Sequence, residues 1–191
     1  MAPTFILFLI IFLEGYVVLS AELLAIRLMI PFTGSGTDTV SIIIGAVLMP
    51  LAFGYFSGGR FKVKRGKKRA LTIRRKLLFN LWVSAIFLTV GLSYSFLHWA
   101  AESIYFYWAW KDRVVLTTLY ALVFIVTPVY LLGQTVPLIS NYFSKARLSV
   151  MAGRILFFST LGSFMGAIFC TLILMTYVGV HNSVTITIGC I

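Results

Sequence analysis

The chain has 191 residues, of which 60% are hydrophobic and only 11% charged, and its mean hydropathy is +1.01. A soluble domain carries about 25% charged residues, so this composition excludes a water-soluble enzyme, and its hydrophobicity excludes a disordered chain. Lys and Arg outnumber Asp and Glu by 16 to 5. We therefore expect an all-α, polytopic bundle of transmembrane helices that forms a single membrane domain over residues 1–191.

Five segments are apolar enough to cross a bilayer, which takes a helix of about 20 residues. They cover residues 5–30, 40–58, 77–97, 114–138 and 155–178. A sixth apolar segment, 183–191, is too short for a full crossing. It is expected to be a partial span, either as a stub or because the sequence is a piece of a longer protein.

The first segment contains three ionisable residues, Glu14, Glu22 and Arg27. Such residues are costly inside a bilayer and usually face the interior of the bundle, where they find a partner. One interpretation is a polar site for a cationic substrate or a proton relay, and the other is packing between helices. We expect Glu22 to face the interior and to accept a hydrogen bond from another helix or from a Ser or Thr side chain. Arg27, near the outer end, fits a structural role better.

The connection over residues 60–76 contains ten Lys and Arg residues. By the positive-inside rule this loop is cytoplasmic, which places the N-terminus in the cytoplasm as well. Anionic lipid or an acidic partner could bind there, whereas nucleic acid is not expected, because aromatic residues for base stacking are not interleaved. The candidate contact residues of this loop are Arg60, Lys62, Lys64, Arg65, Lys67, Lys68 and Arg69.

The other connections agree with this orientation. The loop after the fourth segment contains Lys145 and Arg147 and no acid, whereas residues 31–39 and 179–182 contain neither Lys nor Arg. The connection over residues 98–113 is rich in aromatic residues, which is typical of a belt or a short helix at the membrane interface. A substrate-binding aromatic box is the alternative. The aromatic residues are Trp99, Tyr105, Phe106, Tyr107, Trp108 and Trp110.

The fourth segment contains two prolines, Pro128 and Pro137, on either side of Gln134 and Thr135. Proline removes a donor from the helical hydrogen-bond ladder, so a break or kink is expected between the two prolines. Gln134 is expected to face protein rather than lipid, because its amide needs partners. Broken membrane helices occur at transporter substrate sites, and a kinked packing helix is the alternative.

Small residues recur in the second and fifth segments, and Gly162 and Gly166 have the GxxxG spacing that is typical of close helix packing. We find no catalytic motif and no metal-ligand spacing around the two histidines or the two cysteines, so no cofactor is expected.

Several of these motifs together resemble the membrane-embedded spermidine synthase-like (polyamine aminopropyltransferase-like) family. Glu22 and Arg27, five residues apart within residues 21–28, resemble its first-helix motif. The other matching segments follow in order along the chain: the Gly- and Ser-containing loop 31–36, the small-residue helix end 51–60, residues 132–138 with Gly133, Pro137 and Leu138, Gly153-Arg154, and the small-residue helix 159–167.

Fused members of that family carry a cytoplasmic methyltransferase-like catalytic domain after the membrane part, and this chain contains none of it. The resemblance therefore implies a non-catalytic membrane module in a bacterial inner (plasma) membrane. It would anchor or partner an enzyme or a larger membrane complex, with a small-molecule path past Glu14, Glu22 and Gln134 as an option. The expected partners are the lipid bilayer, other membrane or cytoplasmic subunits, or a second copy.

Two alternatives remain open at the level of sequence. Residues 54–68 partly resemble the loop between the second and third spans of major facilitator transporters, although Gly59 stands where that loop has an Asp. On this interpretation the chain is half of a transporter that works as a dimer. The other alternative is a purely structural accessory subunit of a membrane complex.

Overall fold

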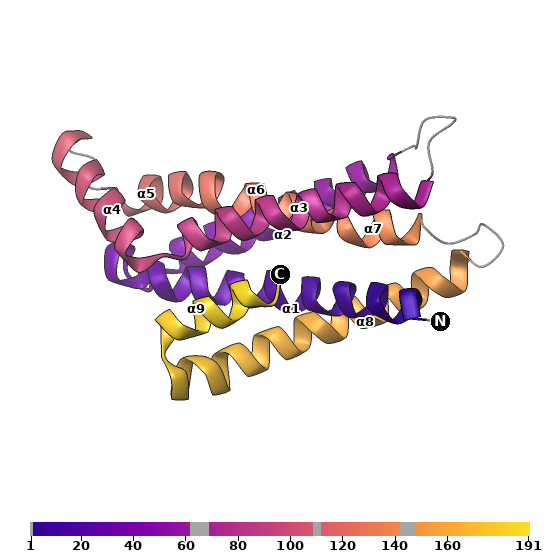
Figure 1. Cartoon of the computed structure of the whole chain (residues 1–191). Helices are drawn as coiled ribbons and strands as arrows, with labels where there is room; N and C mark the ends of the chain where they lie inside the picture. Colours follow the sequence, from indigo (N-terminus) through magenta and orange to yellow (C-terminus); the bar gives the residue numbers. More distant parts are fainter. Residues whose placement is uncertain (1, 62–68, 109–111, 142–147) are drawn as a thin grey trace.

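The computed structural model describes residues 2–61, 69–108, 112–141 and 148–191, and every regular element within these ranges is helical (Figure 1). The elements are α1 (Ala2–Thr33), α2 (Thr37–Gly59), α3 (Arg69–Gly91), α4 (Tyr94–Trp108), α5 (Arg113–Tyr120), the π-helix η1 (Ala121–Ile125), α6 (Val126–Gly133), α7 (Thr135–Ser140), α8 (Leu148–Ile168), the π-helix η3 (Phe169–Val178) and α9 (Val180–Gly189).

Four helical stretches within the described ranges are long and apolar enough to cross a membrane. A bent pair of helices, Leu71–Gly91 and Tyr94–Ser103, becomes a fifth if it counts as one span. The chain is therefore an integral membrane helix bundle with four or five candidate spans. The first four stretches are Phe5–Thr33, Thr37–Gly59, Arg113–Ser140 and Val150–Val178.

The third span differs from the expected range of 77–97. Helix α3 begins at Arg69 and ends at Gly91, and the chain then turns by 63° into α4. The turn contains a Gly and a Ser, at Gly91 and Ser93, and such residues commonly accompany sharp kinks in helices. The described part of the aromatic connection up to Trp108 is helical and belongs to α4, which agrees with the alternative of a short helix there.

Two stretches of π-helix were not expected from the sequence. In η1 the N–H of Val126 donates to the carbonyl of Ala121, five residues earlier. This wider turn lies just before Pro128, whose ring would crowd the carbonyl four residues before it in a regular helix. The second π-helix, η3, ends at Gly179, whose φ of 84° is accessible to glycine and allows the chain to reverse into α9.

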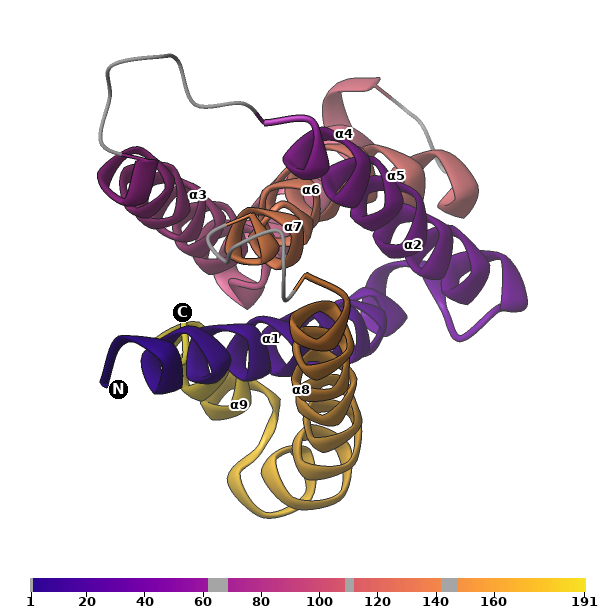
Figure 2. The ribbon, with the colours of Figure 1, turned by 90° about the vertical axis from the view of Figure 1, so that its right-hand side faces the viewer.

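The helices form two groups that meet along α1 (Figure 2). Helix α1 packs along α8, while α2 and α3 pack on either side of α6 and α7. Helix α9 returns against α1 and α3. The main core contains Leu24, Ile43, Leu88 and Leu132, which are almost completely buried and come from α1, α2, α3 and α6.

Candidate functional site

Glu14 is the most deeply buried ionisable group of the candidate polar site, with 3% of its surface exposed. The hydroxyl of Ser159, on α8, donates to Oε2 of Glu14 over 3.3 Å. Glu14 also lines a cavity of about 30 Å³ together with Leu81, Leu132 and Cys190. A cavity of this size has room for one or two water molecules, but not for an organic substrate.

Glycines bring α1 and α8 close enough for this contact. A methyl group added to Gly15 would overlap the carbonyl oxygen of Ser159, and one added to Gly162 would overlap that of Phe12. Further along, a methyl group added to Gly166 would overlap the carbonyl of Tyr16. The predicted GxxxG packing of the fifth segment is therefore present, and its partner is α1.

Two serine side chains add hydrogen bonds along the same interface. Ser163 Oγ donates to the carbonyl of Gly15 over 3.3 Å, and Ser20 Oγ donates to that of Gly166 over 3.2 Å. Small residues and interhelical hydrogen bonds are the usual means by which helices associate in a bilayer. In this setting, the bond between Ser159 and Glu14 belongs to a continuous packing interface.

Glu22 and Arg27 are not part of that interface. Glu22 is half-buried, and no residue in the described part of the chain forms a hydrogen bond or ion pair with it. The donor from another helix that we expected for Glu22 is therefore not found among these residues, and it is Glu14 that has such a donor. Arg27 is exposed near the end of α1 where the chain passes into α2.

Gln134 lies at the break in the fourth span, as the two prolines predict. Helix α6 ends at Gly133, Gln134 forms a turn, and α7 begins at Thr135. The Gln134 side chain is buried, and its Oε1 accepts a hydrogen bond from Nδ2 of Asn80, on α3, over 3.2 Å. The same Asn80 nitrogen is 3.2 Å from the carbonyl of Leu131. Thr135 is also buried, and its hydroxyl has no partner in the described part of the chain.

A second α3 side chain supports the same broken helix. Ser84, one turn after Asn80, donates from Oγ to the carbonyl of Pro128 over 3.1 Å. On the opposite side of α6, a methyl group at Gly54 of α2 would crowd the backbone of Tyr130 and Gly133. The irregular helix is thus held between α2 and α3 by close backbone contact on one side and hydrogen bonds on the other.

Sequence reasoning missed Asn80, Ser84 and Ser159 as partners of the candidate site. Asn80 and Ser84 stand four residues apart in an apolar segment, so they share one helical face. That spacing could have indicated a polar stripe directed toward another helix. Ser159 is one small residue among several, and the sequence contains no signal that assigns it to Glu14.

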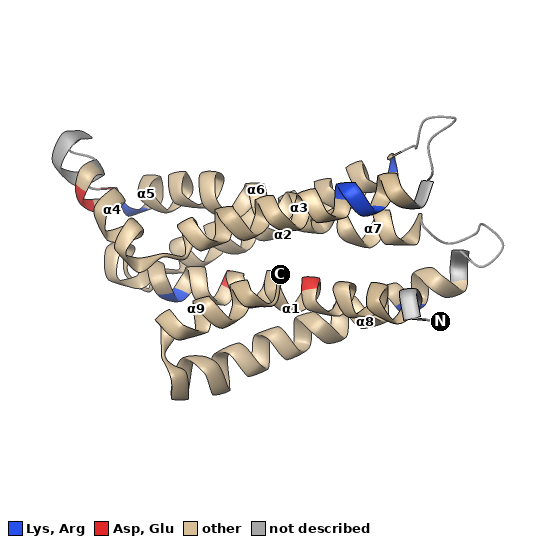
Figure 3. Cartoon of the chain, viewed as in Figure 1, with Lys and Arg blue, Asp and Glu red and all other residues tan. Residues whose placement is uncertain are grey.

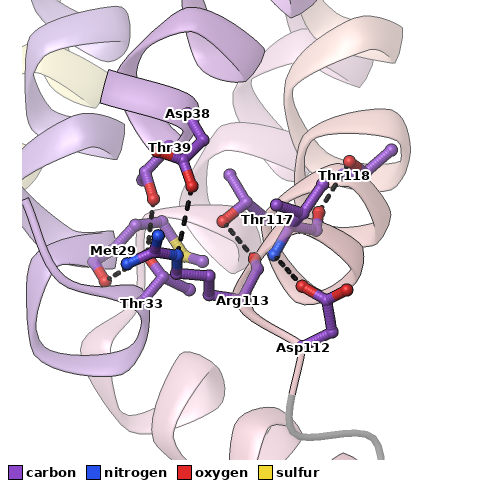
Figure 4. A network of polar contacts seen from close by, with 9 residues as sticks. Met29, Thr33, Asp38, Thr39, Asp112, Arg113, Thr117 and Thr118 are labelled. Carbon is purple, nitrogen blue, oxygen red and sulfur yellow. Dashed lines mark hydrogen bonds and ion pairs between the residues drawn. The ribbon is translucent and has the colours of Figure 1, made fainter. Parts of the chain in front are cut away.

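A further polar network at the opposite end from the N-terminus was also missed (Figure 4). Nε of Arg113, at the start of α5, lies 3.1 Å from Oδ2 of Asp38, at the start of α2. Nearby, Thr39 donates to Thr33 over 3.3 Å, and Thr33 donates to the carbonyl of Met29 over 3.0 Å. The ion pair is partly exposed, so it joins the two helix ends at a gain of about 0–1 kcal/mol.

Only the two ends of the basic loop lie within the described residues. The guanidinium of Arg60 lies 4.4 Å from the ring centroid of Phe56, and Nζ of Lys76 lies 4.2 Å from that of Phe61. Helix α3 begins at Arg69, whose side chain is not described. The other residues for which we made predictions, Lys62, Lys64, Arg65, Lys67, Lys68, Trp110, Lys145 and Arg147, lie outside the described residues, as do the side chains of Tyr105, Phe106, Tyr107 and Trp108.

The candidate polar residues therefore belong to separate helix contacts. Glu14 is at the interface of α1 and α8, and Gln134 is at that of α3 with α6 and α7. The cavity beside Glu14 is not lined by Glu22, Arg27, Gln134 or Thr135. Within the described ranges, no group of three or more His, Cys, Asp or Glu side chains could hold a metal ion.

No family model, curated protein or solved structure matches this chain. Its function therefore has to be inferred from its own sequence and contacts.

Proposed function

We propose that this chain is a non-catalytic integral membrane module that anchors or partners an enzyme or a larger membrane complex. The observation that carries the proposal is the pairing of the buried polar groups at helix–helix contacts. Ser159 binds Glu14 and Asn80 binds Gln134, so these two candidate site residues stabilise contacts between helices. Polar side chains used in this way are typical of helix association in a bilayer.

The open surface of the bundle supports a partnering role. Helices α2, α5, η1 and α6 border a groove of about 570 Å³ that is lined mainly by apolar side chains. Gly45 on its wall faces open space, in contrast to Gly54 further along the same helix, which packs against α6. A surface of this kind accommodates lipid or another helix without any change in the bundle itself.

A transport function has less support in the geometry. A path would need polar groups from several helices around one opening. The cavity next to Glu14 holds about 30 Å³, and Gln134 does not line it. The turn at Gln134, where the two prolines predicted a broken helix, is packed against neighbouring helices, and so is the π-helix η1.

The finer features of the proposal come from the sequence. They are the resemblance to the membrane part of spermidine synthase-like proteins, a cytoplasmic N-terminus and a bacterial inner membrane. The positive charge of residues 60–76 supports the orientation. The Glu22–Arg27 spacing and the glycine-rich helix end at Gly58 and Gly59 support the resemblance.

The proposal can be tested by extracting the tagged chain from its own membrane in mild detergent and weighing the intact complex by native mass spectrometry. We expect a defined complex that contains a fixed number of copies of a second protein. A parallel sample in sealed vesicles tests transport of labelled polyamines and protons. The proposal fails if the chain is isolated without a second protein, or if it moves a solute across the vesicle membrane in a manner that depends on Glu14.

A further inference from the structure

Helices α1 and α3 border an apolar groove of about 500 Å³ on the side of the bundle that holds the N-terminus. The two helices lie apart in this region, and α7 lies between them, as Figure 2 shows. Ile139 of α7 is fully buried and forms part of the groove wall. We refer to this feature as the α1–α3 groove, and its lining includes Ile6, Ile10, Leu71, Arg74, Leu78 and Ile139.

One lining residue is charged. Arg74 lies in the early turns of α3, where Figure 3 shows basic residues and no acidic ones in the described part of the chain. The sequence contains no acid between Asp38 and Glu102, and neither ion pair found in the described ranges involves Arg74. Lys76, two residues later, contacts the ring of Phe61 instead. The groove thus combines an aliphatic wall with an unneutralised guanidinium.

We propose that the α1–α3 groove binds an anionic phospholipid, with an acyl chain along the aliphatic wall and the phosphate at Arg74. A guanidinium can form two parallel hydrogen bonds to a phosphate. A zwitterionic or neutral headgroup lacks the net negative charge of an anionic one, so its attraction to the guanidinium is weaker. Attraction of a basic residue to an anionic membrane surface is worth about 1 kcal/mol. The lipid proposal depends only on the membrane location given in the proposed function, and it does not require a protein partner.

The lining of the groove fits hydrocarbon as its occupant. An extended acyl chain needs no polar partner along its length. The lining side chains other than Arg74 are all aliphatic, and the guanidinium of Arg74 supplies the one charged group that a headgroup phosphate can pair with.

The experiment compares wild-type protein with Arg74→Gln and with Arg75→Gln as the matched control. Arg75 is also exposed on the first turns of α3 but does not line the groove. Each protein is purified from vesicles of equal parts phosphatidylglycerol and phosphatidylcholine, and the retained lipid is identified by native mass spectrometry. We expect wild type to retain phosphatidylglycerol selectively, Arg74→Gln to lose about fivefold in that selectivity, and Arg75→Gln to change it less than twofold.

A second pair of variants tests the groove without changing charge. Leu78 lines the groove, whereas its neighbour Phe79 is 64% exposed and does not. We expect Leu78→Trp to displace the retained lipid and Phe79→Trp to leave it bound. The proposal is overturned if wild type retains the two lipids equally or if the paired variants have equal effects. It is also overturned if millimolar inorganic phosphate alone displaces the lipid, or if a co-purifying protein helix is crosslinked to Leu78. A chain that retains the lipid but binds no protein would contradict the proposed function alone.

Discussion

Glu14 and the glycines around it show how a costly residue is accommodated in this bundle. An acid inside a bilayer needs a partner and distance from lipid. The close approach of α1 and α8 at Gly15 and Gly162 provides both, because it seals Glu14 from the surface and brings the Ser159 hydroxyl within 3.3 Å. At the scale of single residues, the absence of a side chain at Gly162 is thus as important as the hydrogen bond.

The first prediction concerns the packing at Gly162. Gly162→Ala adds a methyl group that overlaps the carbonyl of Phe12, so we expect it to lower the free energy of unfolding by about 1–3 kcal/mol. Gly153→Ala is the matched control, since it lies on the same helix and its added methyl group meets no atom within 4 Å. Both changes gain about the same helix propensity, so their difference isolates packing. Equilibrium unfolding in mixed micelles measures it, and equal stabilities would show that α1 and α8 do not pack as described.

The second prediction concerns the chemistry at Glu14. Glu14→Gln keeps an oxygen that accepts the Ser159 hydrogen bond and removes an ionisable group from the bilayer, so we expect at least wild-type stability. Ser159→Ala loses the bond and should cost about 0.6 kcal/mol, the average for such bonds between membrane helices. Glu22→Gln, at a half-buried site with no bonded partner in the described residues, serves as the control and should be neutral.

The same variants separate structure from function. If Glu14 only stabilises the bundle, Glu14→Gln should accumulate normally and keep any partner complex in native mass spectrometry. A Glu14→Gln protein that folds and accumulates but loses the activity of its complex would mean that the carboxylate carries a proton or a cation.

Among the helices, the fourth span departs from regular α-helical geometry at two places. It passes from α5 through a π-helix to α6, breaks at Gln134 and continues as α7. Each irregular carbonyl described above is met by a neighbour: Pro128 by Ser84, and Leu131 by Asn80. The irregular backbone of the fourth span is therefore stabilised by side chains of a neighbouring helix, α3, and not by the fourth span alone.

The sequence predicts some of this and not the rest, for physical reasons. Pro128 and Pro137 each remove a ladder donor, which is a local effect, so the break between them could be predicted. The 63° bend between α3 and α4 could not, because the apolar run continues through it and hydropathy does not register a change of direction. The pairing of Gln134 with Asn80 depends on which helices become neighbours, and a single sequence does not contain that information.

The third prediction concerns this span. Asn80→Leu leaves Gln134 Oε1 without its donor and removes the side-chain donor to the Leu131 carbonyl, which keeps the backbone N–H of Gln134, so we expect a loss of about 1–3 kcal/mol in stability and faster amide exchange in α7. Thr89→Val is the control, because the Thr89 hydroxyl bonds only to the carbonyl of Ala85 in its own helix. Hydrogen–deuterium exchange followed by mass spectrometry gives both readouts. If Asn80→Leu exchanges no faster than Thr89→Val in α7, then Asn80 does not hold the break.

On the scale of the whole molecule, charge and apolar surface are distributed in different ways. Described basic residues lie toward the ends of the bundle, and the ribbon between them shows no Lys or Arg (Figure 3). Phe53, Trp82 and Phe157, from three different helices, are each more than half exposed. A helix bundle in a bilayer needs apolar side chains on the surfaces that face lipid. These exposed apolar residues therefore agree with helices that are long enough to span a membrane.

The fourth prediction concerns the side of the membrane on which each end lies. The excess of Lys and Arg in residues 60–76 predicts a cytoplasmic location for that loop, because basic loops are retained on that side during insertion. In a background with Cys170 and Cys190 replaced by Ala, we expect Lys67→Cys in intact cells to resist an impermeant maleimide and to react only after the membrane is opened. Ser35→Cys, at an exposed position between α1 and α2, is the opposite control and should react from outside. Labelling of Lys67→Cys from outside, with Ser35→Cys protected, would reverse the orientation of the entire bundle.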